Sequence, residues 1–286
     1  MTQPFRILQQ ATERLADKFL ILAKNTPESH FGEPLREAAS KLSGANLKAR
    51  REFLTGIDPF TGTSRSFEIR HVESVPLADS NGKVIGVKFP AQQDNADNWV
   101  RWARAERRTS DIAYSTKEPV VTPHPDGGGS RWELPEARQA PWASGDGQPP
   151  TYVFTHGNPD GERIVRELSD SGETSDIRVD GPTFGRILAA NDHYRRAIEE
   201  NSRITVDSTC YGDSSAEGMT AELWKAGIDT EVYAFKTTTY SWSIGSESHV
   251  DASTLSAITH SSAEEALLTD PITHYAPRDR KSADST

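Results

Sequence analysis

The sequence is poor in cysteine and in cationic side chains. Its 286 residues include one cysteine, Cys210, which excludes an intramolecular disulfide and a zinc site made of several thiolates. Lysine and arginine number 32 against 42 aspartate and glutamate residues, giving a net charge of -10. Binding to nucleic-acid phosphates needs an excess of positive charge, so we expect no nucleic-acid partner. One local cluster is interpreted as the solvated face of a helix: Arg101, Arg104, Arg107 and Arg108.

Long apolar runs are also missing. A membrane-spanning helix needs about 20 consecutive, mostly apolar residues, and no segment of the sequence approaches this. The start, MTQPFRILQQATERLADKF, has no apolar stretch typical of a secretory signal peptide. We therefore expect no membrane span, and a protein that is cytoplasmic or exported by a route without a cleavable signal peptide.

The first part of the chain indicates helices followed by strands. Apolar residues at helical spacing predict helices from Phe5 to Leu22 and from Pro34 to Leu54, so residues 1–60 are interpreted as a helical N-terminal segment. After a turn-rich stretch near residue 60, SFEIRHVESVPL and NGKVIGVKF predict strands that are joined through the Asn81-Gly82 turn. The segment DNADNWVRWARAERR predicts a further helix.

Residues 122–150 are dense in proline, glycine and polar residues and show no periodicity. They are interpreted as a long loop, and we expect a mobile flap near the functional site that proteases cleave first. The last residues, 277–286, are expected to form a disordered tail.

The segment from Thr151 onward carries the strongest pattern. The apolar run TYVFT is followed by a helix that Asp180-Gly181-Pro182 announces, and then by the strand RITVDST. A capping box at Ser214 and Glu217 predicts the next helix, and TEVYAF predicts another strand. Alternating strands and helices predict a mainly parallel sheet, in which functional groups gather beyond the carboxyl ends of the strands. His156 and Cys210 both follow such ends.

A thiol beside an imidazole is typical of nucleophilic catalysis. An unperturbed thiol has a pKa of about 8.5, so a nearby histidine and a helix N-terminus help to generate the reactive thiolate. The helix that begins near Ser214 would present its positive end to Cys210. Gly157 permits close approach of the backbone to a substrate, and its N–H could donate to an oxyanion.

Two segments resemble the signature blocks of clan CD, the caspase-like cysteine peptidases. They are YVFTHG (152–157) and ITVDSTC (204–210). The clan includes caspases, legumains, clostripain-like enzymes and the self-cleaving domains of large bacterial toxins. The segment DGPTFGRILAANDHYRRAIEENSRITVDSTCYGDSSAEGMTAELWKAG more closely resembles the "lonely Cys" domain of very large bacterial proteins, and the resemblance spans roughly residues 65–240.

This resemblance implies a caspase-like three-layer sandwich with a mainly parallel sheet over residues 61–276, preceded by the helical N-terminal segment. It implies a cysteine endopeptidase that needs no cofactor or metal. Cys210 would be the nucleophile and His156 the acid and base, with the N–H groups of Gly157 and Cys210 forming the oxyanion hole. The substrate would be a protein or peptide, either the chain itself or a partner, in a bacterial toxin, defence or cell-death system.

Two acidic residues bracket Cys210 in the sequence. Asp207 and Asp213 are predicted to line a pocket for a basic or neutral P1 side chain of the substrate. An acidic P1 side chain buried in that pocket would need cationic partners there. The alternative to an enzyme is a non-catalytic binding or scaffold module with the same fold, which the bulky neighbours of Cys210, Thr209 and Tyr211, favour. Other histidines are interpreted as structural or exposed: His193, His249, His260 and His274.

Overall fold

The computed structural model describes residues 52–91, 96–118, 120–123, 130–133, 136–144, 147–245, 250–259 and 267–277. The chain divides into two compact units, residues 1–52 and 53–286, and the description that follows concerns the second. The predicted helices of residues 1–51 and the predicted tail of residues 278–286 lie outside the described residues. The predicted second helix does not extend to Leu54, because Phe53–Ile57 forms strand β1.

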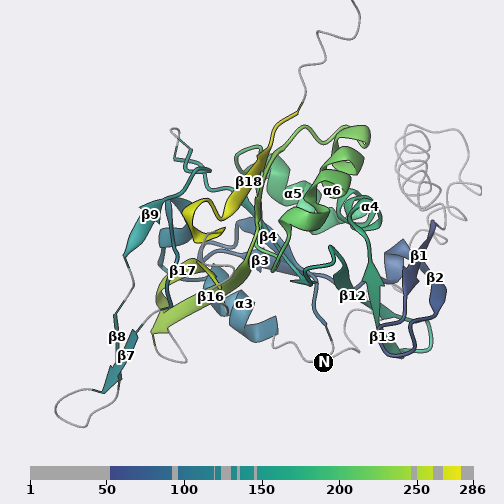
Figure 1. Ribbon diagram of the computed structural model, residues 1–286, viewed down its shortest axis with the longest axis horizontal. Coiled ribbons are helices and arrows are strands. Elements are labelled where there is room, and N and C mark those ends of the chain that lie inside the picture. Colours follow the sequence, from purple (N-terminus) through teal and green to yellow (C-terminus); the bar gives the residue numbers. More distant parts are fainter. Residues whose placement is uncertain are drawn as a thin grey trace, which may run out of the picture. The chain divides into compact units, whose positions relative to one another are not determined.

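A six-stranded mixed sheet forms the centre of this unit (Figure 1). Its strand order is β18-β15-β14-β10-β4-β3, in which the four inner strands are parallel and the two edge strands are antiparallel. The fold is therefore a mixed α/β fold whose central sheet is mainly parallel, as the alternating strands and helices predicted. The strands are β3 (Val75–Ala78), β4 (Val84–Lys88), β10 (Thr151–Phe154), β14 (Ile204–Asp207), β15 (Glu231–Phe235) and β18 (Ile272–Tyr275).

The inner strands are buried on both faces, as expected for parallel strands. Strand β10 shows this well, because all four of its residues are buried. Val153 belongs to the apolar core on one face of the sheet, whereas Tyr152 and Phe154 belong to the core on the other. Successive side chains of a strand point to opposite faces, so this short apolar run anchors both cores.

Three helices cover the first face: α4 (Gly181–Ala190), α5 (Asp192–Glu200) and α6 (Asp213–Lys225). Asp180 caps α4 by accepting a hydrogen bond of 2.8 Å from the backbone N–H of Thr183, which confirms the predicted start. Residues 181–200 do not form one continuous helix. Instead Asn191 ends α4 and caps α5, where its side chain accepts a hydrogen bond of 3.0 Å from the backbone N–H of Tyr194.

Helices α4 and α6 pack closely because glycine lies at their contact. A Cβ atom at Gly181 would lie 2.1 Å from the carbonyl oxygen of Ser215, and one at Gly185 would lie 2.5 Å from that of Met219. Only glycine lets the two backbones approach so closely. The contact fixes the first turns of α6, which directly follow Cys210 in the chain.

The second face carries α3 (Ala96–Ala103) and a smaller sheet (Figure 1). The predicted helix ends at Ala103, and Arg107–Arg108 instead forms a short strand, β5, that pairs with β17. Trp102 is fully buried in this core, and its indole N–H donates to the carbonyl of Thr254 over 3.1 Å. The sheet, in the order β16-β17-β6-β9, contains β16 (Thr238–Gly245), β17 (Val250–Ile258), β6 (Ala113–Ser115) and β9 (Ala137–Gln139).

The predicted loop of residues 122–150 has regular structure in the part that is described. Strands β7 (Val120–Pro123) and β8 (Ser130–Glu133) form an antiparallel pair, and β9 joins the smaller sheet. Trp142 is fully buried against Tyr114 and Phe235, so this segment contributes to the core. The interpretation as a loop without structure of its own was wrong there, while residues 124–129, 134–135 and 145–146 lie outside the described residues.

A third, antiparallel sheet contains the strand with His156. Its order is β11-β12-β13-β1-β2, with β11 (His156–Gly157), β12 (Arg163–Leu168), β13 (Thr174–Val179), β1 (Phe53–Ile57) and β2 (Ser64–Glu68). The predicted strand SFEIRHVESVPL is thus split, because β2 pairs with β1 while β3 pairs with β4. The Asn81-Gly82 turn does join β3 to β4, with a positive φ of 81° at Gly82. Short 3-10 helices also occur, among them η1 (Ile69–His71) and η2 (Thr109–Asp111). No described helix is long and apolar enough to cross a membrane.

Candidate active site

The strands that lead to His156 and Cys210 are neighbours. Strands β10 and β14 pair in parallel, with Val153 opposite Asp207. The backbone N–H of Ser208 continues this pairing by donating to the carbonyl of Val153 over 2.9 Å. The chain therefore leaves both strands at the same edge of the central sheet, as the sequence pattern predicted.

Gly157 brings the two segments into direct backbone contact. A Cβ atom at this position would lie 2.3 Å from the carbonyl oxygen of Cys210 and 2.6 Å from Cγ2 of Thr209. These distances are too short for any residue other than glycine. The small size of Gly157 was predicted to allow the approach of a substrate, and the structure gives it a second reason, the approach of the Cys210 peptide.

Both candidate side chains are accessible. His156 is exposed, and Cys210 is partly exposed at the sheet edge. The sulfur of Cys210 lies 3.7 Å from the carbonyl oxygen and 3.9 Å from Oγ1 of Thr239, at the start of β16. The Thr239 hydroxyl donates to the carbonyl of Ser208 over 2.7 Å, so β16 is fixed beside the thiol.

The turn after Cys210 has an uncommon backbone conformation. Tyr211 has a φ of +53°, and no other non-glycine residue of the described ranges has a positive φ. Such a residue costs about 1–3 kcal/mol and persists only where surrounding contacts impose it. Here the N–H of Tyr211 donates to the carbonyl of Thr237 over 3.0 Å, and its hydroxyl accepts from that of Thr238 over 3.3 Å. Contacts with the segment that leads into β16 therefore hold the turn that presents Cys210.

Helix α6 begins just after this turn, but not with the predicted capping box. Its first residue is Asp213, and its N-cap, Gly212, makes no side-chain capping bond. Ser214 lies inside the first turn, where its hydroxyl donates back to the carbonyl of Tyr211 over 2.7 Å. The capping role assigned to Ser214 and Glu217 was therefore wrong, although the positive end of the helix still follows Cys210 directly.

Asp207 is not available to a substrate. It is fully buried, and its two carboxylate oxygens accept hydrogen bonds of 3.0 and 2.5 Å from the guanidinium of Arg163, which is also fully buried. Asp207 is the last residue of β14 and lies between β10 and β15 in the ladder. A buried carboxylate needs such a partner, so the predicted contact of Asp207 with a basic P1 side chain does not fit the structure.

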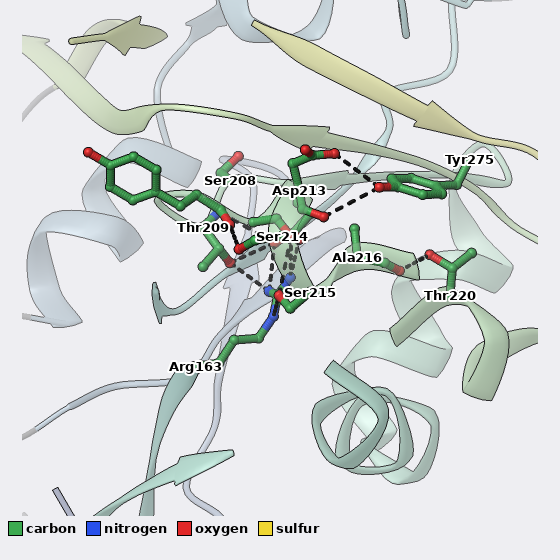
Figure 2. A network of polar contacts seen from close by, with 12 residues as sticks. Arg163, Ser208, Thr209, Asp213, Ser214, Ser215, Ala216, Thr220 and Tyr275 are labelled. Carbon is green, nitrogen blue, oxygen red and sulfur yellow. Dashed lines mark hydrogen bonds and ion pairs between the residues drawn. The ribbon is translucent and has the colours of Figure 1, made fainter. Parts of the chain in front are cut away.

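Asp213 has a different environment, which Figure 2 shows. It is partly exposed as the first residue of α6, and its carboxylate accepts a hydrogen bond of 3.0 Å from the hydroxyl of Tyr275 on β18. Burial, and then the bond to this carboxylate, raise the pKa of the Tyr275 phenol, so Tyr275 remains a donor. Asp213 thus keeps access to solvent and stays a candidate for contact with a basic group.

Arg163, Thr239 and Tyr240 were not predicted from the sequence. Burial, and then the neighbouring Cys210, raise the pKa of the Tyr240 phenol. No local sequence signal distinguished these residues, because each is remote from Cys210 in the chain. Of the other histidines, His193 is partly buried in α5 and His274 lies 3.0 Å from Glu231, while residues 249 and 260 lie outside the described ranges.

The described residues contain no group of three or more histidine, cysteine, aspartate or glutamate side chains suited to hold a metal ion. Comparison of the chain with protein-family models, with curated proteins and with solved structures found no match.

Proposed function

We propose that this protein is a cysteine endopeptidase in which Cys210 is the nucleophile and His156 is the acid and base. The observation that carries the proposal is the contact at Gly157, whose backbone lies against the carbonyl group of Cys210 and the side chain of Thr209. The two motifs meet at the carboxyl edge of two neighbouring parallel strands, where α/β folds place functional groups.

The proposed reaction follows from these groups. His156 accepts the thiol proton, and the sulfur of Cys210 attacks the carbonyl carbon of the scissile peptide bond. Proton transfer from His156 to the leaving amine breaks the C–N bond and leaves a thioester. Water then loses a proton to His156 and attacks the thioester, which releases the carboxylic acid and restores the thiol. The backbone N–H groups of Gly157 and Cys210 are the proposed donors to the oxyanion.

The caspase-like assignment is part of this proposal. It is supported by the resemblance of YVFTHG and ITVDSTC to the clan CD blocks and by the mainly parallel central sheet. The two apolar cores on opposite faces of that sheet are compatible with a three-layer caspase-like sandwich. By analogy with that clan, we propose that the protein cleaves itself or a partner protein in a toxin or cell-death system. Asp213 is the remaining candidate for contact with a basic P1 side chain.

The test uses two variants and one control. Cys210→Ala and His156→Gln should each abolish cleavage of a peptide library and of the chain itself, whereas His193→Gln should leave cleavage unchanged. Because Cys210 is the only cysteine, an iodoacetamide probe reads this one thiol. We expect wild-type protein to be alkylated at neutral pH faster than the His156→Gln variant. Cleavage that persists in the Cys210→Ala variant would refute the proposal.

A non-catalytic binding module remains the second candidate. It is favoured by the contact of the Cys210 sulfur with the Thr239 carbonyl and by the bulky neighbours Thr209 and Tyr211. The same experiment separates the two functions. A binding module should cleave no peptide of the library, and its alkylation rate should be the same with and without His156.

A further inference from the structure

Arg163 is a fully buried cation on β12, and every N–H of its guanidinium has an acceptor. Nε donates to the hydroxyl of Ser215 over 2.9 Å, and one terminal nitrogen donates to Asp207 and Thr209 over 3.0 and 2.9 Å. The other terminal nitrogen donates to Asp207 and to the carbonyl of Gly212 over 2.5 and 3.2 Å. Figure 2 shows part of this network, with Arg163, Thr209 and Ser215 labelled.

The acceptors lie on both sides of Cys210. Asp207 and Thr209 precede the cysteine, and Gly212 and Ser215 follow it. Thr209 also donates its hydroxyl to Asp207 over 2.6 Å, so the segment before the cysteine is itself cross-linked. One rigid, planar group therefore sets the distance between the two ends of the turn.

The backbone of Arg163 holds the other half of the site. In the pairing of β11 with β12, Gly157 lies opposite Arg163, and His156 lies opposite Ile164. The backbone of Arg163 thus aligns the strand that contains His156, and its side chain aligns the turn that contains Cys210. Among the described contacts, this residue joins the two segments through both its backbone and its side chain.

The contribution of this network lies in geometry rather than in net stability. A buried ion pair is often no more stabilising than a well-packed apolar replacement. The arginine fork, however, fixes direction as well as distance, because bidentate bonds to a carboxylate are directional and a lysine ammonium offers only a point charge. The guanidinium also lies 4.7 Å from the ring centre of Phe184 on α4, which fixes its plane.

We propose that Arg163 is a positioning residue that holds the Cys210 turn in register with His156. It acts through Asp207, Thr209, Gly212 and Ser215 and does not touch substrate, because its side chain has no exposed surface. The inference rests on the proposed Cys–His chemistry.

The principal test is Arg163→Lys, which keeps the positive charge but removes the planar guanidinium and its bidentate hydrogen bonds to Asp207. A displacement of about 1 Å at a catalytic group can lower the rate about 100-fold. We therefore expect kcat of the Arg163→Lys variant to fall about 100-fold, with KM nearly unchanged, because the substrate-binding surface is not altered. The matched control is Arg166→Lys, on the same strand, where the arginine pairs with Glu73 and Asp176 over 3.8 and 3.3 Å. This control should retain the wild-type kcat.

Two milder variants keep the test valid if Arg163→Lys fails to fold by circular dichroism. Ser215→Ala removes the acceptor of Nε, and Thr209→Val removes one acceptor of a terminal nitrogen. Each should lower kcat several-fold, and the double variant should lower it further. A folded Arg163→Lys protein with wild-type kcat would overturn the inference, as would Ser215→Ala and Thr209→Val variants that are both fully active.

Alkylation of Cys210 separates failure of this inference from failure of the proposed function. In an otherwise wild-type protein, His156→Gln should change the pH profile of the alkylation rate, because the proposed dyad couples the Cys210 thiol to the His156 imidazole. In the Arg163→Lys background, the same substitution should have little effect. If His156→Gln changes the profile equally in both backgrounds, Arg163 does not position the dyad. If it has no effect in the wild type, the proposed dyad is itself wrong.

Discussion

Substitution of Gly157 by alanine tests the contact on which the site depends. The new Cβ atom would lie 2.3 Å from the Cys210 carbonyl oxygen, whereas ordinary contacts of this kind begin at 3.4 Å. The two backbones must therefore separate by about 1 Å, and overpacking of this kind costs roughly 1–3 kcal/mol of folding free energy. A shift of this size at the proposed reacting groups is expected to lower kcat about 100-fold.

The assay measures urea unfolding and peptide cleavage on the same samples. Gly56→Ala is the matched control, because a Cβ atom at Gly56 would lie 2.3 Å from Cγ2 of Ile177 and 2.8 Å from the carbonyl oxygen of Arg178, both on β13, and would not meet Cys210. Both variants should lose comparable stability, but only Gly157→Ala should lose kcat. A Gly157→Ala protein with wild-type kcat, or equal loss of kcat in both variants, would refute the argument that this backbone contact aligns the dyad.

Three further predictions concern stability and specificity. Burial lowers the pKa of His193 below 6.5, so protonation favours the unfolded state and the free energy of unfolding should fall as the pH drops below about 6.5. His193→Gln should therefore flatten the pH dependence of urea unfolding between about pH 7 and 5. Trp142→Ala removes a fully buried side chain from the second core and should cost about 3–5 kcal/mol in the same assay, whereas a loss below 1 kcal/mol would show that residues 136–144 are not part of the core. Asp213→Asn should lower kcat/KM for peptides with a basic P1 residue more than for neutral ones, and equal effects on both would exclude a direct charge contact.

Local signals in the sequence predicted much of the central fold. The apolar run before His156 and the Asp180 cap depend only on neighbouring residues, and both are confirmed. The alternating strands and helices predicted the parallel pairing of β10 and β14, which brings the ends of both strands to one edge. These features could be predicted because periodicity and capping are set by interactions within a few residues.

The errors have a common physical cause. Residues 122–150 have the composition of a loop, but Trp142 packs into the second core and β9 pairs with β6, contacts that composition does not reveal. Likewise, Ser214 and Glu217 match a capping box in spacing, but the turn after Cys210 places Ser214 inside the helix. In both cases tertiary contacts override a local pattern.

Arg163 was missed for the same reason. It lies 44 residues from Asp207 and 52 from Ser215, and nothing in its own segment, ERIVREL, indicates a role at the cysteine. No arginine lies between Asp207 and Asp213 in the sequence, so Asp207 was predicted to line an acidic pocket. Arg163 lies on β12, within the long connection between β10 and β14, and the fold brings its side chain to Asp207 at the end of β14.

The position of each aspartate relative to the sheet explains why the two behave differently. Asp207 is the last residue of β14 that still pairs on both sides, with Val153 and with Ala234, so it is enclosed by neighbouring strands. An enclosed carboxylate must have a buried cation or be protonated, and this requirement predicts a partner such as Arg163 even when the sequence does not locate it. Asp213 lies beyond the end of the ladder, on the first turn of α6, and remains partly exposed. In a parallel sheet, therefore, an acidic residue at the last position of a strand that still pairs with both neighbouring strands indicates a structural ion pair. An acidic residue after that position is the one to test for contact with a substrate.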